Sequence, residues 1–430
     1  MREIVRNRMR SAFGAGRTYL GAVGKWVFVA ALTGAVCGAL GTAFHVGVEY
    51  ATELRAANGW LLYFLPAAGL AIVALYKLLN MEGRNTNDIL EEVHSGRGVS
   101  LKLLPAIFGA TILTHLCGGS VGREGAALQM GGTIGYQTGQ LLRLDDKDLR
   151  TATTIGMSAF FSALFGTPMA ATVFAMEITS VGSMYYVELL PCLVSSLSAY
   201  GVSRLFGVAP TRFAVAAPSL GPEMLLRAAV LCALCAVLSV VFCETIHFTE
   251  TQAAKRAPNP WLRAVVGGVL IVALTLLLGT TDYNGAGMAV IVRAVEQGEA
   301  SGAAFALKLV FTAISLAAGF KGGEVVPSFF VGATFGCVVG PLLGIPASFA
   351  AALGLTAVFC GAVNCPLAST FLAVELFGSN GMLYFALACA LSFILSGYSG
   401  IYSSQRILYD KLKARYINVM TNAYHAGRDN

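Results

Sequence analysis

The residues best suited to chemistry are a charged pair inside a glycine-rich run. Arg123 and Glu124 lie in GGSVGREGAALQMGGTIG, residues 118–135, in the middle of a long apolar region. A charged side chain near the centre of a bilayer costs about 3 kcal/mol on insertion scales, so such residues are either functional or paired for structural reasons. Glu124 is therefore a candidate proton-binding group. The alternative is that the two charges simply neutralise each other between packed helices.

The surrounding glycines indicate how the backbone accommodates this pair. Gly118, Gly119, Gly122 and Gly125 allow close backbone approach and positive φ angles. They predict a segment that breaks at mid-membrane and restarts as a helix over residues 126–142. A helix start carries unpaired N–H groups and partial positive charge, so it binds anions. A broken helix with a carboxylate at its mouth predicts anion transport controlled by an acid.

Composition places the chain in a membrane. Of 430 residues, 56% are hydrophobic and only 12% are charged, with a mean hydropathy of +0.70. Soluble domains carry about 25% charged residues, so a polytopic membrane protein is predicted. We expect no cleavable signal peptide, and the positive-inside rule places both termini in the cytoplasm. The net charge of +6 follows from this topology without a nucleic-acid partner. The basic residues are Arg2, Arg6, Arg8, Arg10, Arg17 and Lys25 before the first apolar run, and Lys411, Lys413 and Arg415 near the end.

The sequence shows no pattern typical of a metal site, a cofactor site or an enzyme active site. The ten cysteines lie almost entirely in apolar runs, and the five histidines are dispersed. Cys232 and Cys235 have C-x-x-C spacing but no second pair, so buried small side chains are the favoured interpretation. There is no Ser/His/Asp grouping and no nucleotide-binding loop, so we predict a protein that is not an enzyme.

An internal repeat organises the chain. GMSAFFSALFGTPMAATVFAMEI in the first half aligns without gaps with GLTAVFCGAVNCPLASTFLAVEL in the second, which places Pro168 on Pro366 and Glu177 on Glu375. The equivalent positions of the two glutamates favour a structural role, capping or bonding a neighbouring helix. Several apolar runs are shorter than the roughly 20 residues that a perpendicular helix needs, which is typical of transporters with broken helices.

Upstream of that match, the two glycine-rich elements also correspond. GREGAALQMGGTIG aligns with GEVVPSFFVGATFG. Because sites in such transporters form where the repeats meet, residues 123–124 and 324–326 are predicted to face one cavity. The residues alone leave open whether the repeats are parallel or inverted.

These elements resemble the CLC family of chloride channels and anion/proton antiporters over about residues 26–409. GREGA looks like the family's G-R-E-G-P, GEVVP looks like its G-x-F-x-P, and Tyr402 in GIYSSQ falls at its anion-coordinating tyrosine. The resemblance implies an all-α polytopic fold of two inverted-topology repeats with broken and re-entrant helices. It further implies a homodimer in the lipid bilayer of the cell membrane, with Glu124 as the gating glutamate. We expect one transport domain over residues 1–430, with halves at about 26–206 and 223–409 and no CBS domains.

The departures from the family pattern are specific. Where a chloride-contacting serine is expected, the chain reads GRNTNDI, and Thr86 is the best match, although a helix cap is an equal alternative. In the second motif, Val325 replaces the family's phenylalanine, and an additional acid, Glu324, precedes it. The family's internal proton-transfer glutamate aligns with Ile178, so that acid is missing here. This combination resembles the fluoride/proton antiporter branch. The predicted anion-binding residues are Thr86, Asn87, Gly122, Arg123, Gly125, Val325, Val326 and Tyr402, with Glu124 as proton carrier and Glu324 as a second acid.

Physical chemistry gives fluoride independent support. Fluoride is small and accepts hydrogen bonds strongly, so its site needs dense donors, such as helix-start N–H groups and hydroxyls. A carboxyl group donates only when protonated, and burial in an apolar environment favours that form. Protonation and anion entry therefore favour each other. We predict a fluoride/proton antiporter that exports fluoride; a chloride channel or chloride/proton antiporter of the same fold is the alternative.

Overall fold

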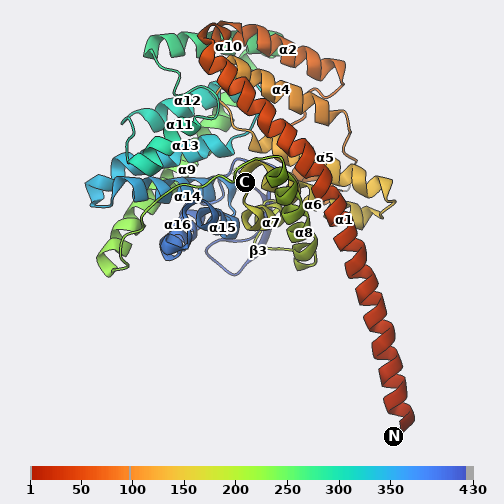
Figure 1. Ribbon diagram of the computed structural model, residues 1–430. Helices are drawn as coiled ribbons and strands as arrows, with labels where there is room; N and C mark the ends of the chain where they lie inside the picture. Colours follow the sequence, from red (N-terminus) through yellow and green to blue (C-terminus); the bar gives the residue numbers. More distant parts are fainter. Residues whose placement is uncertain (1, 96–97, 423–430) are drawn as a thin grey trace.

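The computed structural model describes residues 2–95 and 98–422, with side chains from residue 20 onward. The basic residues before residue 20, on which the cytoplasmic N-terminus was predicted, have side chains outside this description. The structure is 73% helical, as the all-α prediction requires. Figure 1 shows helices packed around one another, with the first helix extending well beyond the bundle.

The first half of the chain supplies eight α-helices of the described part. The predicted restart after the glycine-rich break is present as α5, which begins two residues earlier than expected. The helices are α1 (Arg2–Ala57), α2 (Leu65–Leu78), α3 (Thr86–Ser95), α4 (Leu103–Cys117), α5 (Glu124–Leu141), α6 (Asp146–Phe165), α7 (Pro168–Glu177) and α8 (Leu189–Leu205).

The second half repeats this order. Its helices are α9 (Pro222–Arg256), α10 (Pro260–Leu278), α11 (Met288–Val292), α12 (Ala304–Ala317), α13 (Val325–Val339), α14 (Ala347–Val363), α15 (Pro366–Phe377) and α16 (Met382–Leu395). A small sheet, absent from the sequence-based prediction, joins the two halves. Its strands are β1 (Ser180–Val181), β2 (Arg406–Tyr409) and β3 (Tyr416–Met420), with β1 parallel to β2 and β2 antiparallel to β3.

Several helices of the described residues are long and apolar enough to cross a membrane. Shorter apolar helices of 10–17 residues lie between them, as the broken-helix prediction requires. The chain is therefore an integral membrane protein. The spanning candidates are Leu20–Ala57, Gly59–Leu78, Pro222–Arg256, Pro260–Leu278 and Val325–Leu343.

The two halves are inverted. A short connection joins the end of α1 to the start of α2, so these two points lie on the same face. The 20-residue apolar segment Gly59–Leu78, of which α2 is the larger part, is long enough to span a membrane, so its far end, near Gly83, lies on the opposite face. Gly83 lines a cavity together with Ala254, close to the end of α9. The equivalent helices α1 and α9 therefore end on opposite faces, which resolves the orientation that the residues alone left open.

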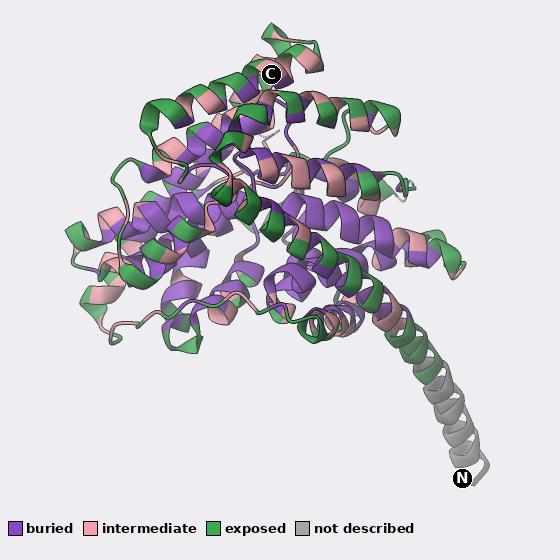
Figure 2. Cartoon of the chain, turned by 45° about the horizontal axis from the view of Figure 1, so that its top comes forward, coloured by how far each residue is buried: buried purple, intermediate pink, exposed green. Residues whose placement is uncertain are grey.

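Glycine contacts hold the inner helices together in both halves. A Cβ atom added to Gly131 would overlap the carbonyl oxygen of Gly156, and one added to Gly332 would overlap that of Gly354. These contacts join α5 to α6 and α13 to α14, at positions that the repeat alignment makes equivalent. Figure 2 shows buried residues concentrated in the inner helices and exposed ones on the outer helices. Close glycine packing thus builds the rigid frame of the site.

The two repeat-equivalent glutamates cap each other's helices, as predicted. The carboxylate oxygens of Glu177 accept bonds from the first turn of α15, and those of Glu375 accept bonds from the first turn of α7. Both oxygens of each carboxylate are bonded. The donors are the N–H groups of Leu367 (3.3 Å) and Ala368 (2.8 Å) for Glu177, and those of Met169 (3.0 Å) and Ala170 (2.8 Å) for Glu375.

The capping role predicts a loss of stability on truncation. Glu177→Ala leaves buried N–H groups at the start of α15 unpaired, which should lower the free energy of unfolding by about 2 kcal/mol. Thermal unfolding of the purified protein in detergent measures this. Glu299→Ala is the control, because Glu299 is exposed. Equal melting temperatures for the two variants would contradict the capping role.

Candidate functional site

Two helix starts meet at a backbone bridge. Gly122 and Gly323 form an isolated antiparallel bridge, in which the N–H of each donates to the carbonyl of the other at 2.6 and 2.9 Å. Helix α5 begins at Glu124 and α13 at Val325, so the bridge brings both N-terminal ends together. Both helix starts direct N–H groups and partial positive charge into the same region.

Glu124 lies at this junction and is fully buried. Its Oε2 atom accepts hydrogen bonds from the N–H of Arg123 at 3.0 Å and from the N–H of Val326 at 3.2 Å. Its Oε1 atom has no partner among the described residues. The carboxylate thus connects the starts of both repeats, and the structure brings together the two segments that the sequence placed in one cavity.

The Arg123 side chain faces away from the carboxylate. Its Nη1 atom donates to Nδ1 of His45 at 2.8 Å, and its guanidinium lies 6.0 Å from the ring centre of Phe165. The Nε2 atom of His45 lies 3.3 Å from the carboxylate of Glu49. In the described part of the chain no ion pair within 4 Å joins Arg123 to Glu124, so any mutual neutralisation of the two charges acts at longer range.

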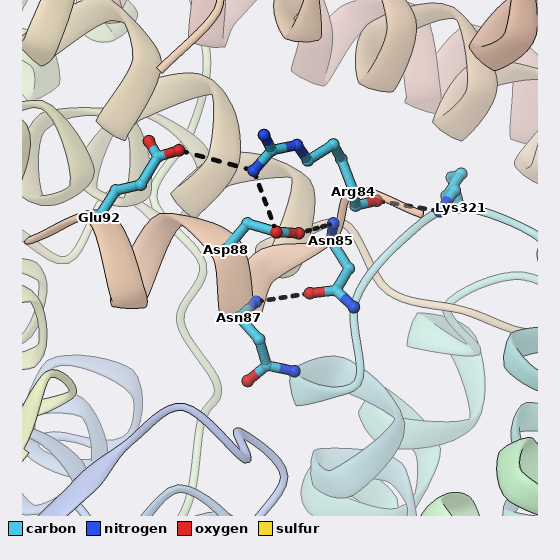
Figure 3. A network of polar contacts seen from close by, with 6 residues as sticks. All are labelled: Arg84, Asn85, Asn87, Asp88, Glu92 and Lys321. Carbon is cyan, nitrogen blue, oxygen red and sulfur yellow. Dashed lines mark hydrogen bonds and ion pairs between the residues drawn. The ribbon is translucent and has the colours of Figure 1, made fainter. Parts of the chain in front are cut away.

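The loop before α3 is fixed by a reciprocal cap, shown in Figure 3. Oδ1 of Asn85 accepts a bond from the N–H of Asn87 at 2.8 Å, and Asp88 accepts one from the N–H of Asn85 at 2.7 Å. This is a capping box, so a helix does begin here, but Asn85 and not Thr86 caps it. Asn85 provides the cap, so the hydroxyl of Thr86 remains available for other contacts.

Thr86 contacts the first turn of α5. Its hydroxyl donates to the carbonyl of Gly125 at 3.4 Å and accepts from Nε2 of Gln129 at 3.2 Å. Gln129 was missed at the sequence level, although it follows Gly125 by four residues and therefore lies on the same helix face. Asn87 reaches the C-terminal segment, because its Oδ1 atom accepts from the N–H of Ser404 at 3.1 Å.

A cavity of about 390 Å³ opens beside these contacts. Of the predicted site residues, Thr86, Asn87, Glu324 and Tyr402 line it. The Tyr402 side chain is only 2% exposed and its hydroxyl has no partner among the described residues. Oε2 of Glu324 and Oε1 of Gln129 are likewise unpaired there. Because buried polar atoms are nearly always hydrogen-bonded, this concentration of unpaired groups marks a place suited to a polar ligand.

The cavity is also lined by ionisable residues that the sequence did not single out. They come from the end of α9, the start of α10 and the loop before α13: His247, Glu250, Arg263 and Lys321. Lys321 donates from Nζ to the carbonyl of Arg84 at 3.2 Å, which ties that loop to the segment before α3 (Figure 3).

Val325 and Ile178, which the sequence analysis also singled out, are buried and contact neighbouring residues. Val325 is fully buried as the first residue of α13, and its carbonyl accepts from the hydroxyl of Ser328 at 2.6 Å. Ile178 is fully buried at the end of α7, where its carbonyl accepts from Nε2 of Gln405 at 3.0 Å. The N–H of Gln405 also donates to the carbonyl of Tyr402 at 3.1 Å, which helps fix the tyrosine.

Comparison with known proteins identifies the family. A model described as voltage gated chloride channel matches residues 68–397. The chain belongs to this family. Its members are channels and transporters, so the protein is not an enzyme. A chloride/fluoride channel protein of Pseudomonas syringae pv. tomato is 34% identical over 400 residues, covering 90% of this chain and 88% of that protein. An H(+)/Cl(−) exchange transporter of Vibrio campbellii is 24% identical over 383 residues, covering 81% of each.

Solved structures of CLC-type antiporters superpose on this chain, which agrees with the family assignment. A CLC-type fluoride/proton antiporter superposes with a TM-score of 0.86 at 31% identity, covering 90% of this chain and 98% of that chain. A slow cyanobacterial Cl−/H+ antiporter superposes with a TM-score of 0.73 at 18% identity, covering 86% of this chain and 94% of that chain. The second likeness shows the family's fold.

The contact between α5 and the Thr86 loop can be tested with one methyl group. A Cβ atom at Gly125 would lie 2.9 Å from both the carbonyl of Gly322 and the hydroxyl of Thr86. Gly125→Ala should therefore push these segments apart. We expect the overpacking to raise the free-energy barrier to transport by about 1.4 kcal/mol, which would slow anion efflux from liposomes about tenfold. Gly201→Ala is the control, since nothing lies within 4 Å of that position. Equal efflux through both variants would contradict the proposed tight contact.

Proposed function

We propose that the protein is a fluoride/proton antiporter that exports fluoride across the cell membrane. The observation that carries this proposal is the position of Glu124, whose carboxylate accepts from the starts of both α5 and α13. An anion attracted to these helix starts competes with that carboxylate for the same N–H groups. The relative named as a chloride/fluoride channel protein and the structure titled as a fluoride/proton antiporter support fluoride as the ion.

Proton coupling follows from this competition. When Glu124 binds a proton, it loses its negative charge and holds the N–H of Val326 less strongly. The helix starts are then available to an incoming anion. When the anion leaves, the carboxylate returns and releases its proton. Protonation and anion binding therefore depend on each other at one position.

The other predicted residues assist this exchange. Gly122 and Gly125 permit the close backbone approach, and the N–H of Val326 is a direct donor to the anion. Thr86 and Tyr402 offer hydroxyl groups at the cavity, which suit a strongly accepting ion such as fluoride. The further members of the proposed site are Asn87 as a cavity donor, Arg123 and Val325 through their backbone, and Glu324 as a second acid.

The assembly and orientation are part of the proposal. We place the cavity and both termini on the cytoplasmic side, because the basic residues at each end favour it. The protein is proposed to act as a homodimer of single transport domains, with repeat halves at about 26–206 and 223–409.

Ion selectivity is the first test. Liposomes containing the purified protein should release fluoride faster than chloride, and a fluoride gradient should drive protons uphill. Ion-selective electrodes and a pH-sensitive dye measure the two fluxes. Equal chloride and fluoride rates would show that fluoride selectivity is wrong. Downhill fluoride flux without uphill proton movement would identify a channel.

Removing the acid at the junction is the second test. Glu124→Gln keeps the size and hydrogen-bonding capacity of the side chain but cannot exchange a proton. Proton movement driven by the fluoride gradient should disappear, as read by the same dye assay. Glu299→Gln changes an exposed carboxylate and should leave coupling intact. A fully coupled Glu124→Gln protein would remove Glu124 from the mechanism.

A further inference from the structure

A proton that reaches Glu124 from the cavity side must cross a buried region, because Glu124 is fully enclosed. Helix α7 offers no free acid for this step. Both carboxylate oxygens of Glu177 are bonded to N–H groups of α15, and the next residue is the apolar, fully buried Ile178. A route through α7 would therefore lack a group that can hold a proton. The cavity beside Glu324 is the alternative.

Glu250 is the second carboxyl group that lines this cavity. It lies on α9, less than two turns from the helix end, and its side chain is partly buried. Among the described residues it makes no hydrogen bond and no ion pair within 4 Å. Glu177 and Glu375, in contrast, are fully engaged as caps. The carboxylate of Glu250 is thus available to bind and release protons.

The charges around Glu250 come from every element that faces it. His247 precedes it on α9, Arg263 comes from α10, and Lys321 comes from the loop before α13. Lys321 is held by the carbonyl of Arg84 and lies 4.5 Å from the ring centre of Tyr76, so it does not neutralise Glu250 by direct contact.

The fourth neighbour is another acid. Glu324 lines the same cavity as Glu250. It is the residue before α13, and the N–H of Val326, two residues later, donates to Glu124. The three carboxyl groups therefore form a series from the cavity to the junction of the two helix starts.

We propose that Glu250 is the acid that exchanges protons between the aqueous cavity and the interior of the protein. This inference rests on the proposed antiport function. During fluoride export a proton moves inward: Glu124 passes it to the carboxylate of Glu324, and it crosses the cavity through water to the carboxylate of Glu250, which releases it to the solvent, so charge and protons balance. When the gradients are reversed, Glu250 takes a proton from solvent and the same steps run toward Glu124. A cavity of about 390 Å³ has room for the several water molecules that this transfer requires.

The experiment is Glu250→Gln in proteoliposomes, with fluoride-driven proton flux as the readout. The amide cannot carry a proton, so transport near neutral pH should fall by at least about a hundredfold, the lower range for losing a positioned acid or base. Acidifying both sides supplies protons directly to Glu324 and should restore much of the rate. Glu250→Asp should keep most of the activity, because it retains a carboxyl group in a wide aqueous cavity.

Glu244→Gln on the same helix is the matched control. Its carboxylate accepts from the hydroxyl of Ser399 at 3.1 Å and it does not line the cavity, so this variant should resemble the original protein. Unchanged transport in Glu250→Gln at neutral pH would overturn the inference and leave antiport standing. A loss that neither acid nor Glu250→Asp restores would show a structural role and would also overturn it. An unmodified protein that moves fluoride without protons would instead overturn the proposed function itself.

Discussion

The antiparallel bridge between Gly122 and Gly323 is the contact on which the site depends. Its two hydrogen bonds join the breaks in the two repeats and fix the starts of α5 and α13 next to each other. A Cβ atom on Gly323 would overlap the backbone nitrogen of Gly125, so this approach requires glycine. Without the bridge, each helix start would present an isolated set of N–H groups. With it, one buried carboxylate contacts both helices.

Carboxylates at helix starts serve two different purposes in this protein. Glu177 and Glu375 use both oxygens to cap helices of the opposite repeat, which stabilises the fold and leaves nothing free to exchange. Glu124 uses only Oε2 and leaves Oε1 unpaired. An unpaired buried oxygen is destabilising, so the ionised state of Glu124 is held less firmly than those of the caps. The difference in bonding separates a structural acid from one suited to transport.

The positions of site residues could be predicted from the sequence where the internal repeat relates the two halves. The alignment of the two halves placed Glu124 and Val326 in one region, and the hydrogen bond between them agrees with this. A helix cap before α3 was likewise indicated by local residue types, although it was assigned to Thr86 and lies at Asn85. Gln129 and Glu250 were not recognised, because their significance arises from contacts between distant helices. Glu250 in particular lies near the polar end of an apolar run, where a charged residue normally indicates only the water-facing end of a helix. The strand β1 contains two residues and is too short to leave a periodic pattern.

Because the two halves are inverted, a difference between two equivalent residues distinguishes the two faces of the protein. Arg123 and Glu324 are the residues directly before α5 and α13, so they occupy equivalent positions in the two halves. Arg123 extends to His45 on α1, whereas Glu324 lines the cavity at the end of α9. Because α1 and α9 are equivalent helices that end on opposite faces, the same backbone position presents a cation toward one side and an acid toward the other. Arg123 therefore meets the His45–Glu49 pair, whereas Glu324 meets the cavity. Under the proposed antiport, this difference assigns proton exchange through Glu324 to the cavity side.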